Sequence, residues 1–122
     1  MILPDTSIWI DHLRQADRQL AEILFSKNAL GHPFVIGEIA LGSIPKRGLV
    51  LAQMHALRQP RIAMHHEVLA MIHGHALYRH GLGYIDVHLL ASALLTPGTQ
   101  LWTRDKRLRA AAKQLGLDAG LA

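Results

Sequence analysis

The sequence predicts an α/β fold, in which a mainly parallel central sheet is flanked by helices on both faces as an α/β/α sandwich. Short apolar segments alternate with helical segments along the 122 residues, and no repeat, low-complexity segment or long linker interrupts them. Strands that alternate with helices are typical of parallel sheets whose two faces are covered. Because half of the residues are hydrophobic, a chain of this length can build one core, so we expect a single domain over residues 1–122.

The predicted strands are short apolar segments with proline, glycine or polar residues at their ends. They cover Met1–Leu3, Ala29–Gly31, Arg61–Met64 and Gln100–Thr103. The helical spacing of apolar residues, together with proline or glycine near several ends, predicts helices between and after these strands. The helices cover Thr6–Leu13, Asp17–Phe25, Phe34–Ile44, Leu49–Leu57, His65–His80, Tyr84–Leu95 and Lys106–Leu115.

The composition narrows the class of protein. There are no cysteines, which excludes disulfides and thiolate zinc sites. No apolar run reaches the roughly 20 residues of a membrane span, and the N-terminus lacks the pattern of a secretory signal. We therefore expect a cytoplasmic protein without a membrane partner. Thirteen Lys and Arg against nine acids give a net charge of +4, which favours a polyanionic partner.

Two acids follow predicted strands. Asp5 comes soon after the first strand, and Asp105 comes soon after the last one. Because the carboxyl ends of parallel strands share one edge of a sheet, where ligands bind, the two acids would occupy equivalent positions. Each acid also precedes a predicted helix, where it would serve as an N-cap. Capping and ligand binding can coexist, since a carboxylate has two oxygens.

Two further acids lie on apolar sides of predicted helices. The residues three and four positions from Glu38 are apolar or glycine, and Asp86 begins an apolar stripe along its helix. No Lys or Arg lies within one helical turn of either acid. A charge in such a stripe is costly unless it is paired, protonated or bound to a metal. The alternative for either residue is an acid at the edge of its stripe that reaches solvent.

Together, Asp5, Glu38, Asp86 and Asp105 predict one acidic pocket. Four carboxylates brought close repel one another, and protonation or a divalent cation must relieve that repulsion. Carboxylate and water ligands, without cysteine, favour Mg²⁺, with Mn²⁺ as a further possibility. Mg²⁺ held by carboxylates in a basic protein indicates phosphodiester chemistry, because the ion activates a water and stabilises charge on phosphate oxygens.

Four segments carry a resemblance to a known family. LPDTSIWID, VIGEIALG, GYIDVHLLASAL and LWTRDKRLRAAA occur in the order and approximate spacing of PIN domains, and the first looks like the VapC toxins of type II toxin–antitoxin pairs. The resemblance spans nearly the whole chain and implies a PIN-like domain with metal-dependent endoribonuclease activity. It also implies inhibition by a cognate VapB-type antitoxin, a homodimer, and binding of promoter DNA only as a toxin–antitoxin complex.

The resemblance extends to the individual acids. It places Asp5, Glu38, Asp86 and Asp105 on the four catalytic and metal-binding positions of the family, so none is missing. Within this interpretation Asp5 and Asp86 are direct Mg²⁺ ligands. Glu38 and Asp105 would complete the shell through water or hold a second ion. A metal-activated water would then attack the phosphorus of an RNA phosphodiester.

Polar and basic residues close to these acids are candidates for supporting roles. Thr6, Ser7 and Thr103 could hydrogen-bond the ligand or a water, or could cap the local backbone. Several cations that flank Asp105, or follow the helix of Glu38, could hold the RNA backbone electrostatically. These RNA-binding candidates are Arg104, Lys106, Arg107, Lys46 and Arg47.

The nine histidines match no metal-binding pattern, because none shows the i, i+4 spacing of a helical zinc pair. We expect them at the surface or its boundary, and we expect Trp9 and Trp102 in the core. Two alternatives to a ribonuclease stay open. One is a non-catalytic PIN-type RNA- or protein-binding module, against which the complete acidic quartet counts. The other is a small α/β hydrolase or phosphatase that uses the same acids on a small molecule.

Overall fold

Two parallel strands form the centre of the structure, a computed structural model that describes residues 1–122. β1 (Ile2–Pro4) pairs with β2 (Gln100–Trp102), and the register places Pro4 opposite Trp102. Single parallel pairings widen this sheet on both sides; they join Ile2 to Ala29, Leu30 to Arg58 and Leu101 to Asp118. All pairings are parallel, which confirms the predicted class, although the outer members of the sheet are isolated bridges rather than full strands.

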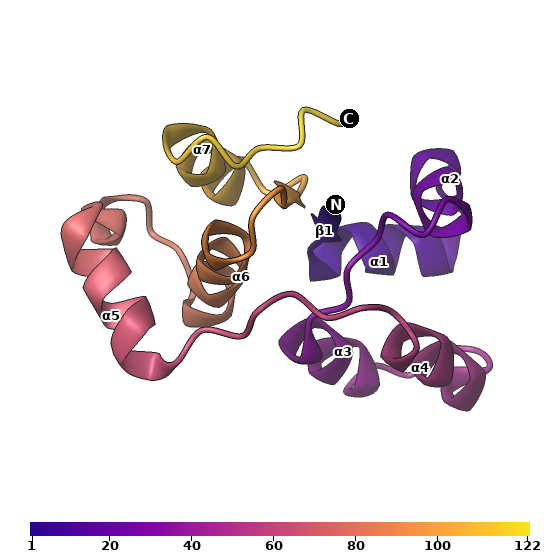
Figure 1. Ribbon diagram of the computed structural model, residues 1–122. Coiled ribbons are helices and arrows are strands. Elements are labelled where there is room, and N and C mark those ends of the chain that lie inside the picture. Colours follow the sequence, from indigo (N-terminus) through magenta and orange to yellow (C-terminus); the bar gives the residue numbers. More distant parts are fainter.

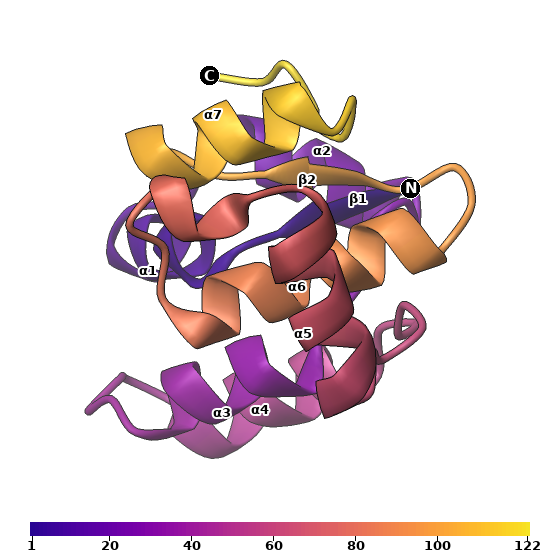
Figure 2. The ribbon, with the colours of Figure 1, turned by 90° about the vertical axis from the view of Figure 1, so that its left-hand side faces the viewer.

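Seven α-helices and one short 3₁₀ helix surround the strands. They are α1 (Thr6–Arg14), α2 (Arg18–Phe25), α3 (Pro33–Ala40), α4 (Arg47–His55), α5 (His65–Gly74), η1 (Leu77–Arg79), α6 (Tyr84–Leu95) and α7 (Lys106–Gln114). Figure 2 shows the strands between α7 on one side and α6 on the other. Figure 1 shows α1 and α2 on one side of β1 and α5 on the opposite side, with α3 and α4 below. None of the helices has the length and apolarity that a membrane span requires.

The core is one continuous cluster of buried apolar side chains between the strands and the helices. The strands contribute Leu3, Leu101 and Trp102, all at most 1% exposed. The helix α6 is buried at every residue from 87 to 93, because it packs against both β2 and α5. Trp9 and Trp102 are buried, as expected from the sequence. Burial of each large apolar side chain contributes about 1.5–3 kcal/mol.

The predicted third strand at Arg61–Met64 is wrong. These residues are irregular, and the parallel pairing on this side of the sheet is made earlier, by Arg58 with Leu30. Pro60 has no N–H to donate to a neighbouring strand, so the parallel pairing made by Arg58 does not continue past it into Arg61–Met64. The backbone N–H of Arg61 is satisfied instead by the Thr96 hydroxyl at 2.8 Å.

Two predicted helices are shorter in the structure. The helix expected over His65–His80 ends at Gly74, and η1 follows it after Ala76, whose φ of 53° lies in the left-handed region. A left-handed residue breaks the helical path of the chain. The helix expected over Phe34–Ile44 ends at Ala40, so the segment that leads to Pro45 is a turn.

A buried histidine joins α3 to α6. His32 is fully buried; its Nδ1 accepts the N–H of Phe34 at 3.0 Å and its Nε2 lies 3.0 Å from the hydroxyl of Ser92. Because Nδ1 accepts, the neutral ring carries its proton on Nε2 and donates to Ser92. Burial and the neighbouring His88 lower the pKa of His32 to about 4. The expectation of surface or boundary histidines is wrong for both residues, since His88 is also buried.

Replacing glycine by alanine should have opposite effects on stability at two positions, Gly31 before α3 and Gly37 within it. A Cβ at Gly31 would lie 3.0 Å from the carbonyl oxygen of Met54 and 3.2 Å from the Cβ of Leu57, whereas a Cβ at Gly37 would meet nothing within 4 Å. We expect Gly31→Ala to lower the free energy of unfolding by about 1–2 kcal/mol through overpacking. Gly37→Ala, in the helix interior, should raise it by up to about 1 kcal/mol. Urea unfolding measures both, and equal effects would contradict the packing at Gly31.

Candidate active site at the carboxyl ends of the strands

Asp5 is the best fixed of the candidate residues. It follows β1, and its backbone N–H donates to the carbonyl oxygen of Trp102 at 2.9 Å, which continues the parallel ladder past the strand. The side chain is 4% exposed. Its Oδ1 accepts the Ser7 hydroxyl at 2.5 Å and the N–H of Ile8 at 3.1 Å, and its Oδ2 accepts the Thr103 hydroxyl at 2.5 Å. Burial raises the pKa of Asp5, while the hydroxyl donors act in the opposite direction.

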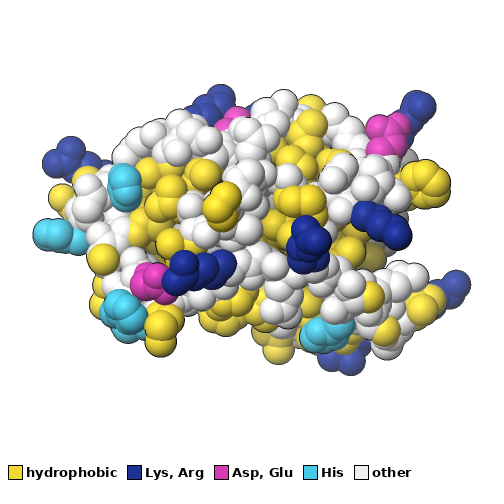
Figure 3. All heavy atoms as spheres, in the orientation of Figure 1, with side chains coloured by type: hydrophobic (Ala, Val, Ile, Leu, Met, Phe, Trp, Pro, Cys, Tyr) yellow, Lys and Arg dark blue, Asp and Glu magenta, His cyan; other side chains and the backbone are white.

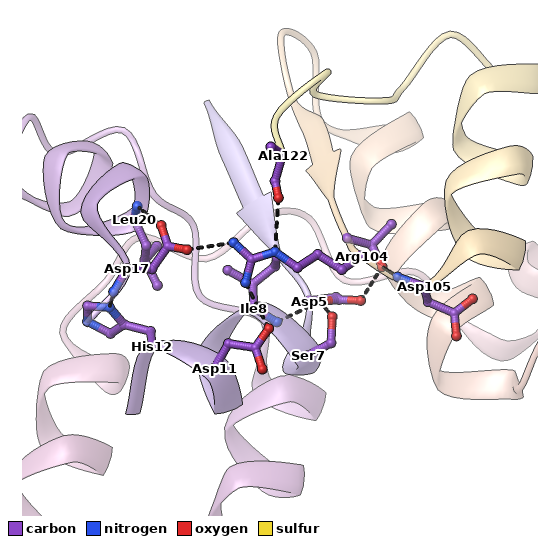
Figure 4. Close-up of polar contacts among 11 residues, drawn as sticks. Asp5, Ser7, Ile8, Asp11, His12, Asp17, Leu20, Arg104, Asp105 and Ala122 are labelled. Atoms are coloured by element: carbon purple, nitrogen blue, oxygen red, sulfur yellow. Dashed lines mark hydrogen bonds and ion pairs between the residues drawn. The ribbon is translucent and has the colours of Figure 1, made fainter. Parts of the chain in front are cut away.

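Thr103 connects the two acids that follow the strands. Its hydroxyl oxygen accepts the N–H of Asp105 at 3.0 Å, so its own hydrogen is free to point to Asp5. Both acids cap the helix that follows them: Asp5 accepts from Ile8 at the start of α1, and Asp105 accepts from Leu108 at 2.9 Å at the start of α7. The predicted N-caps are therefore present at both strand ends. Figure 4 shows the Asp105 carboxylate turned away from that of Asp5.

Asp86 has the most perturbed carboxylate of the site. It lies in the first turn of α6 and is half-buried. Burial raises its pKa to about 6, and the negative charges of Asp5, Asp105 and Glu38 add to the effect. No hydrogen bond or cation offsets these contributions. The structure thus brings the other three predicted acids within electrostatic range of Asp86.

Glu38 reaches the site by a different route from the one expected. The apolar neighbours of Glu38 face the core only in part, because Val35 is buried whereas Phe34 is 37% exposed and Leu41 is 90% exposed. Glu38 itself is exposed, and the core side of α3 consists of Val35, Ile36 and Ile39. Burial is therefore wrong for Glu38, and the alternative, an acid at the edge of its stripe that reaches solvent, is confirmed for this residue. Its carboxylate is nevertheless held at the site, since Oε1 accepts the Thr6 hydroxyl at 2.6 Å.

The four site acids differ from the other five acids of the chain in that they form no ion pairs. Asp11, Asp17, Glu22, Glu67 and Asp118 each have an arginine nitrogen within 4 Å. None of the four site acids is in an ion pair, although the chain carries thirteen Lys and Arg. The unpaired acids are thus the ones that the topology gathers at the strand ends.

The chemistry of these donors fits a hard divalent cation. Carboxylate oxygens without cationic partners, together with water, are the ligands that Mg²⁺ and Mn²⁺ prefer. Asp5 would offer a rigid carboxylate and Asp86 one with both oxygens free of protein donors. No three His, Asp or Glu side chains of the structure converge closely enough to form a complete metal-binding set. The fit therefore concerns the type and gathering of the donors, and no coordination geometry is derived.

A polar pocket of about 250 Å³ opens between Asp86 and Asp105. Lys106 and Arg107, from the first turn of α7, line it together with these two acids. Gly81 and Leu82 complete it, and neither was a candidate from the sequence. In the sequence only the glycines at 81 and 83 marked this segment; in the structure Gly81 is left-handed, with φ of 68°, and the Arg107 guanidinium lies against it. Cations beside unpaired carboxylates can hold a phosphate next to the acidic cluster.

The other basic candidates are engaged elsewhere. The Arg104 guanidinium contacts Asp17 at 2.5 Å and Asp11 at 2.8 Å, lies over the ring of Trp102, and points away from Asp105 (Figure 4). Hydrogen bonds to both acids raise its pKa. Arg47 donates twice to the carbonyl oxygen of Ala40, at 3.1 and 2.8 Å, and so closes the end of α3. Lys46 is exposed and lines neither the polar pocket nor the cluster.

Comparison with known proteins relates nearly the whole chain to one family. The family profile described as PIN domain matches residues 2–114. Two curated relatives, both named Ribonuclease VapC32, come from Mycobacterium tuberculosis strains CDC 1551 / Oshkosh and ATCC 25618 / H37Rv. Each is 49% identical over 117 residues, which cover 96% of this chain and 94% of the relative.

The raised pKa of Asp86 predicts how stability changes with pH. Between its ordinary value of 3.8 and about 6 the folded state binds more protons than the unfolded state, so this group lowers the free energy of unfolding as pH rises. His32 acts oppositely between about 4 and 6.5. We therefore expect Asp86→Asn, which leaves His32 unchanged, to gain stability over wild type from pH 4 to 6, reaching about 2 kcal/mol at pH 7 without divalent metal.

Urea unfolding of both proteins in EDTA at several pH values measures this difference. Glu22→Gln, in an exposed pair with Arg18, is the control and should show no such gain. Parallel pH profiles for Asp86→Asn and wild type would contradict the raised pKa.

Proposed function

Because this chain belongs to the PIN domain family, we propose that it is a Mg²⁺-dependent endoribonuclease that acts as the toxin of a type II, VapBC-like toxin–antitoxin pair. The relatives that cover nearly the whole chain carry the name ribonuclease. The observation that supports the activity most directly is the selective absence of ion pairs at Asp5, Glu38, Asp86 and Asp105. A chain that pairs every other acid leaves these four available for a cation.

The proposed roles of the acids follow from their environments. Asp5 would be the fixed ligand, because Ser7, Thr103 and the N–H of Ile8 hold both of its oxygens in place. Asp86 would be the second direct ligand, whose charge needs a cation in order to persist at neutral pH. Glu38, oriented by Thr6, and Asp105, oriented by Leu108, would complete the shell. When bound, Mg²⁺ or Mn²⁺ supplies a Lewis acid that activates water and offsets charge on the phosphate.

The proposed RNA contact centres on Lys106 and Arg107. Both line the pocket between Asp86 and Asp105, so a phosphate held by them would lie beside the acidic cluster. Arg104 already neutralises Asp11 and Asp17 and is the weaker candidate. Lys46 and Arg47 lie after α3 and would contact only a longer RNA. The site favours RNA over a small phosphate ester because cations flank the acids, as a polyanionic substrate requires.

An apolar hollow supports the proposed antitoxin partner. A cavity of about 500 Å³ lies between α1, α2 and α4, and its lining includes Trp9, Leu24 and Val50. Phe25 at its rim is 92% exposed. Figure 3 shows this hollow at the right of the molecule with hydrophobic side chains in it. An apolar groove between helices suits an amphipathic helix of a VapB-type antitoxin, which would inhibit the toxin.

A second apolar surface supports the proposed homodimer. Phe34 of α3 and Tyr84 of α6 are 37% and 43% exposed, and both rings pack at 4.7 Å on His88. His65 of α5 continues the surface through a hydrogen bond to the Tyr84 hydroxyl. A partly exposed aromatic surface across three helices suits a second copy of the chain. Promoter DNA would be bound only by the toxin–antitoxin complex, and the toxin would act on RNA in the cytoplasm.

If Mg²⁺ binds the acidic cluster, its removal should lower the thermal stability of the protein. At a Mg²⁺ concentration ten times the dissociation constant, binding to the folded state adds about 1.4 kcal/mol, so the Tm at pH 7 should rise by a few degrees above its value in EDTA. Asp86→Asn should abolish this rise even though it stabilises the metal-free protein. Asp118→Asn, whose aspartate pairs with Arg109 away from the cluster, is the matched control and should keep it. Differential scanning fluorimetry measures the shifts, and an equal rise in all three proteins would contradict the site.

A metal-dependent ribonuclease should cleave RNA only when the ion is present. Structured and single-stranded RNAs incubated with the protein and Mg²⁺ should be cleaved at discrete positions, and EDTA should stop the reaction. Asp5→Asn should lower kcat by about a hundredfold or more, because it removes charge from the fixed ligand. Gel electrophoresis of labelled RNA measures the products. Cleavage that survives both EDTA and Asp5→Asn would refute the mechanism, and tight binding without any cleavage would favour the non-catalytic binding module.

A further inference from the structure

We propose that a second cavity, which Glu38 shares with the acidic cluster, is a subsite for one nucleobase of the RNA beside the bond that is cut. This inference rests on the proposed ribonuclease function and adds a determinant of where the RNA is cleaved. The cavity has a volume of about 480 Å³ and lies between α1 and the segment from Glu38 to Pro45. Its volume falls within the roughly 300–1,000 Å³ of sites for small organic groups.

One side of α1 leads from the acidic cluster into this cavity. Thr6, in the first turn of α1, holds Glu38 through the 2.6 Å hydrogen bond. Ile10, Leu13 and Arg14 follow on the same side of the helix, at the spacing of successive turns, and all three line the cavity. Since Glu38 lines it as well, the cavity borders one of the four acids of the cluster.

The lining has the chemistry of a base site rather than a phosphate site. Its walls are aliphatic, with Ile10, Leu13, Ile39 and Ile44 among them. Such walls cover the flat faces of a base, and they offer a phosphate little compensation for its lost water. Lys106 and Arg107 are in the other pocket, and Arg14 is the one cation that lines this cavity.

Two polar groups at this cavity are free to read the edge of a base. Arg14 and Ser43 line it, and neither side chain makes an ion pair or a hydrogen bond in the structure. Single-stranded RNA is recognised by hydrogen bonds to exposed base edges together with contacts to base faces. An unpaired guanidinium beside aliphatic walls provides both.

The two pockets together define a path for the substrate. A phosphate at Lys106 and Arg107 lies next to Asp86 and Asp105, and the base of a neighbouring nucleotide is one sugar away from that phosphate. Glu38 belongs to the same acidic cluster and borders the aliphatic cavity. RNA that crosses the cluster would therefore place its backbone at one pocket and one base in the other. The subsite thereby selects the nucleotide next to the cleaved bond.

The test is a double-mutant cycle that combines a substitution in the protein with the removal of one base from the RNA. Ile10 is 39% exposed, so Ile10→Trp should fill the cavity without disturbing the core; Leu94→Trp, at 43% exposure on the far end of α6, is the matched control. The RNA is an oligonucleotide that carries the mapped cleavage site, or the tightest binder from a randomised pool where no cleavage occurs. One base at a time is removed from the nucleotides around the cut. Kd is measured in EDTA by fluorescence anisotropy, and KM and kcat are measured in Mg²⁺.

We expect Ile10→Trp to raise Kd and KM by about tenfold with kcat little changed, which is the effect of losing one base contact. One abasic position should weaken binding to wild type and to Leu94→Trp by a similar factor, and should have no further effect on Ile10→Trp. Should Ile10→Trp fail to fold, Arg14→Gln takes its place, with Arg18→Gln as control, since Arg18 is exposed on α2.

Additive effects at every abasic position would overturn the subsite while leaving the ribonuclease function intact. Coupling in Kd without cleavage of any RNA would support the subsite and refute the ribonuclease function. Unchanged RNA binding and cleavage by Ile10→Trp, with inhibition by the antitoxin lost, would overturn the subsite and assign the cavity to a side chain of the protein partner.

Discussion

The parallel pairing of β1 with β2 is the interaction on which the rest of the site depends. The register places Pro4 opposite Trp102, and the N–H of Asp5 extends the ladder to the carbonyl oxygen of Trp102. Both strands therefore end at the same edge, and α1 and α7 both begin there. Thr103 uses its single hydroxyl to accept from Asp105 and to donate to Asp5, which fixes the two strand ends to each other. A change in register of one residue would separate this hydroxyl from Asp5.

The distribution of arginines shows how the protein keeps the acidic cluster free. Arg104 follows β2 directly and lies close to Asp105 in sequence, yet its guanidinium is held by Asp11 and Asp17. The side chain is thereby turned towards α1 and α2, where it stabilises the contact between them. The repulsion at Asp86 is left uncompensated within the protein, which is consistent with a site that binds a cation. The repulsion lowers the stability of the folded protein, and a bound cation would restore that stability.

Local rules predicted part of this structure, and long-range contacts decided the rest. Asp5 and Asp105 were predictable because strand ends and N-caps depend on neighbouring residues. Glu38 was identified by an argument that proved wrong, since apolar neighbours occur on both sides of α3 and only packing selects the core side. The burial of His32 depends on Ser92, which is 60 positions away, so no local pattern indicated it. The aliphatic cavity combines residues of α1 with a turn after α3, and only the folded chain brings them together.

The Thr103–Asp5 hydrogen bond also has a consequence for synthesis. Its partners are 98 positions apart in the chain, so Asp5, Glu38 and Asp86 are all synthesised before β2. Until then α1 has no paired strand beside it, and the cluster has neither its fourth acid nor the cations of α7. A nascent chain therefore holds most of the acids without the arrangement that would let them act. The order of the chain itself delays the assembly of the acidic cluster until β2 and the start of α7 have been made.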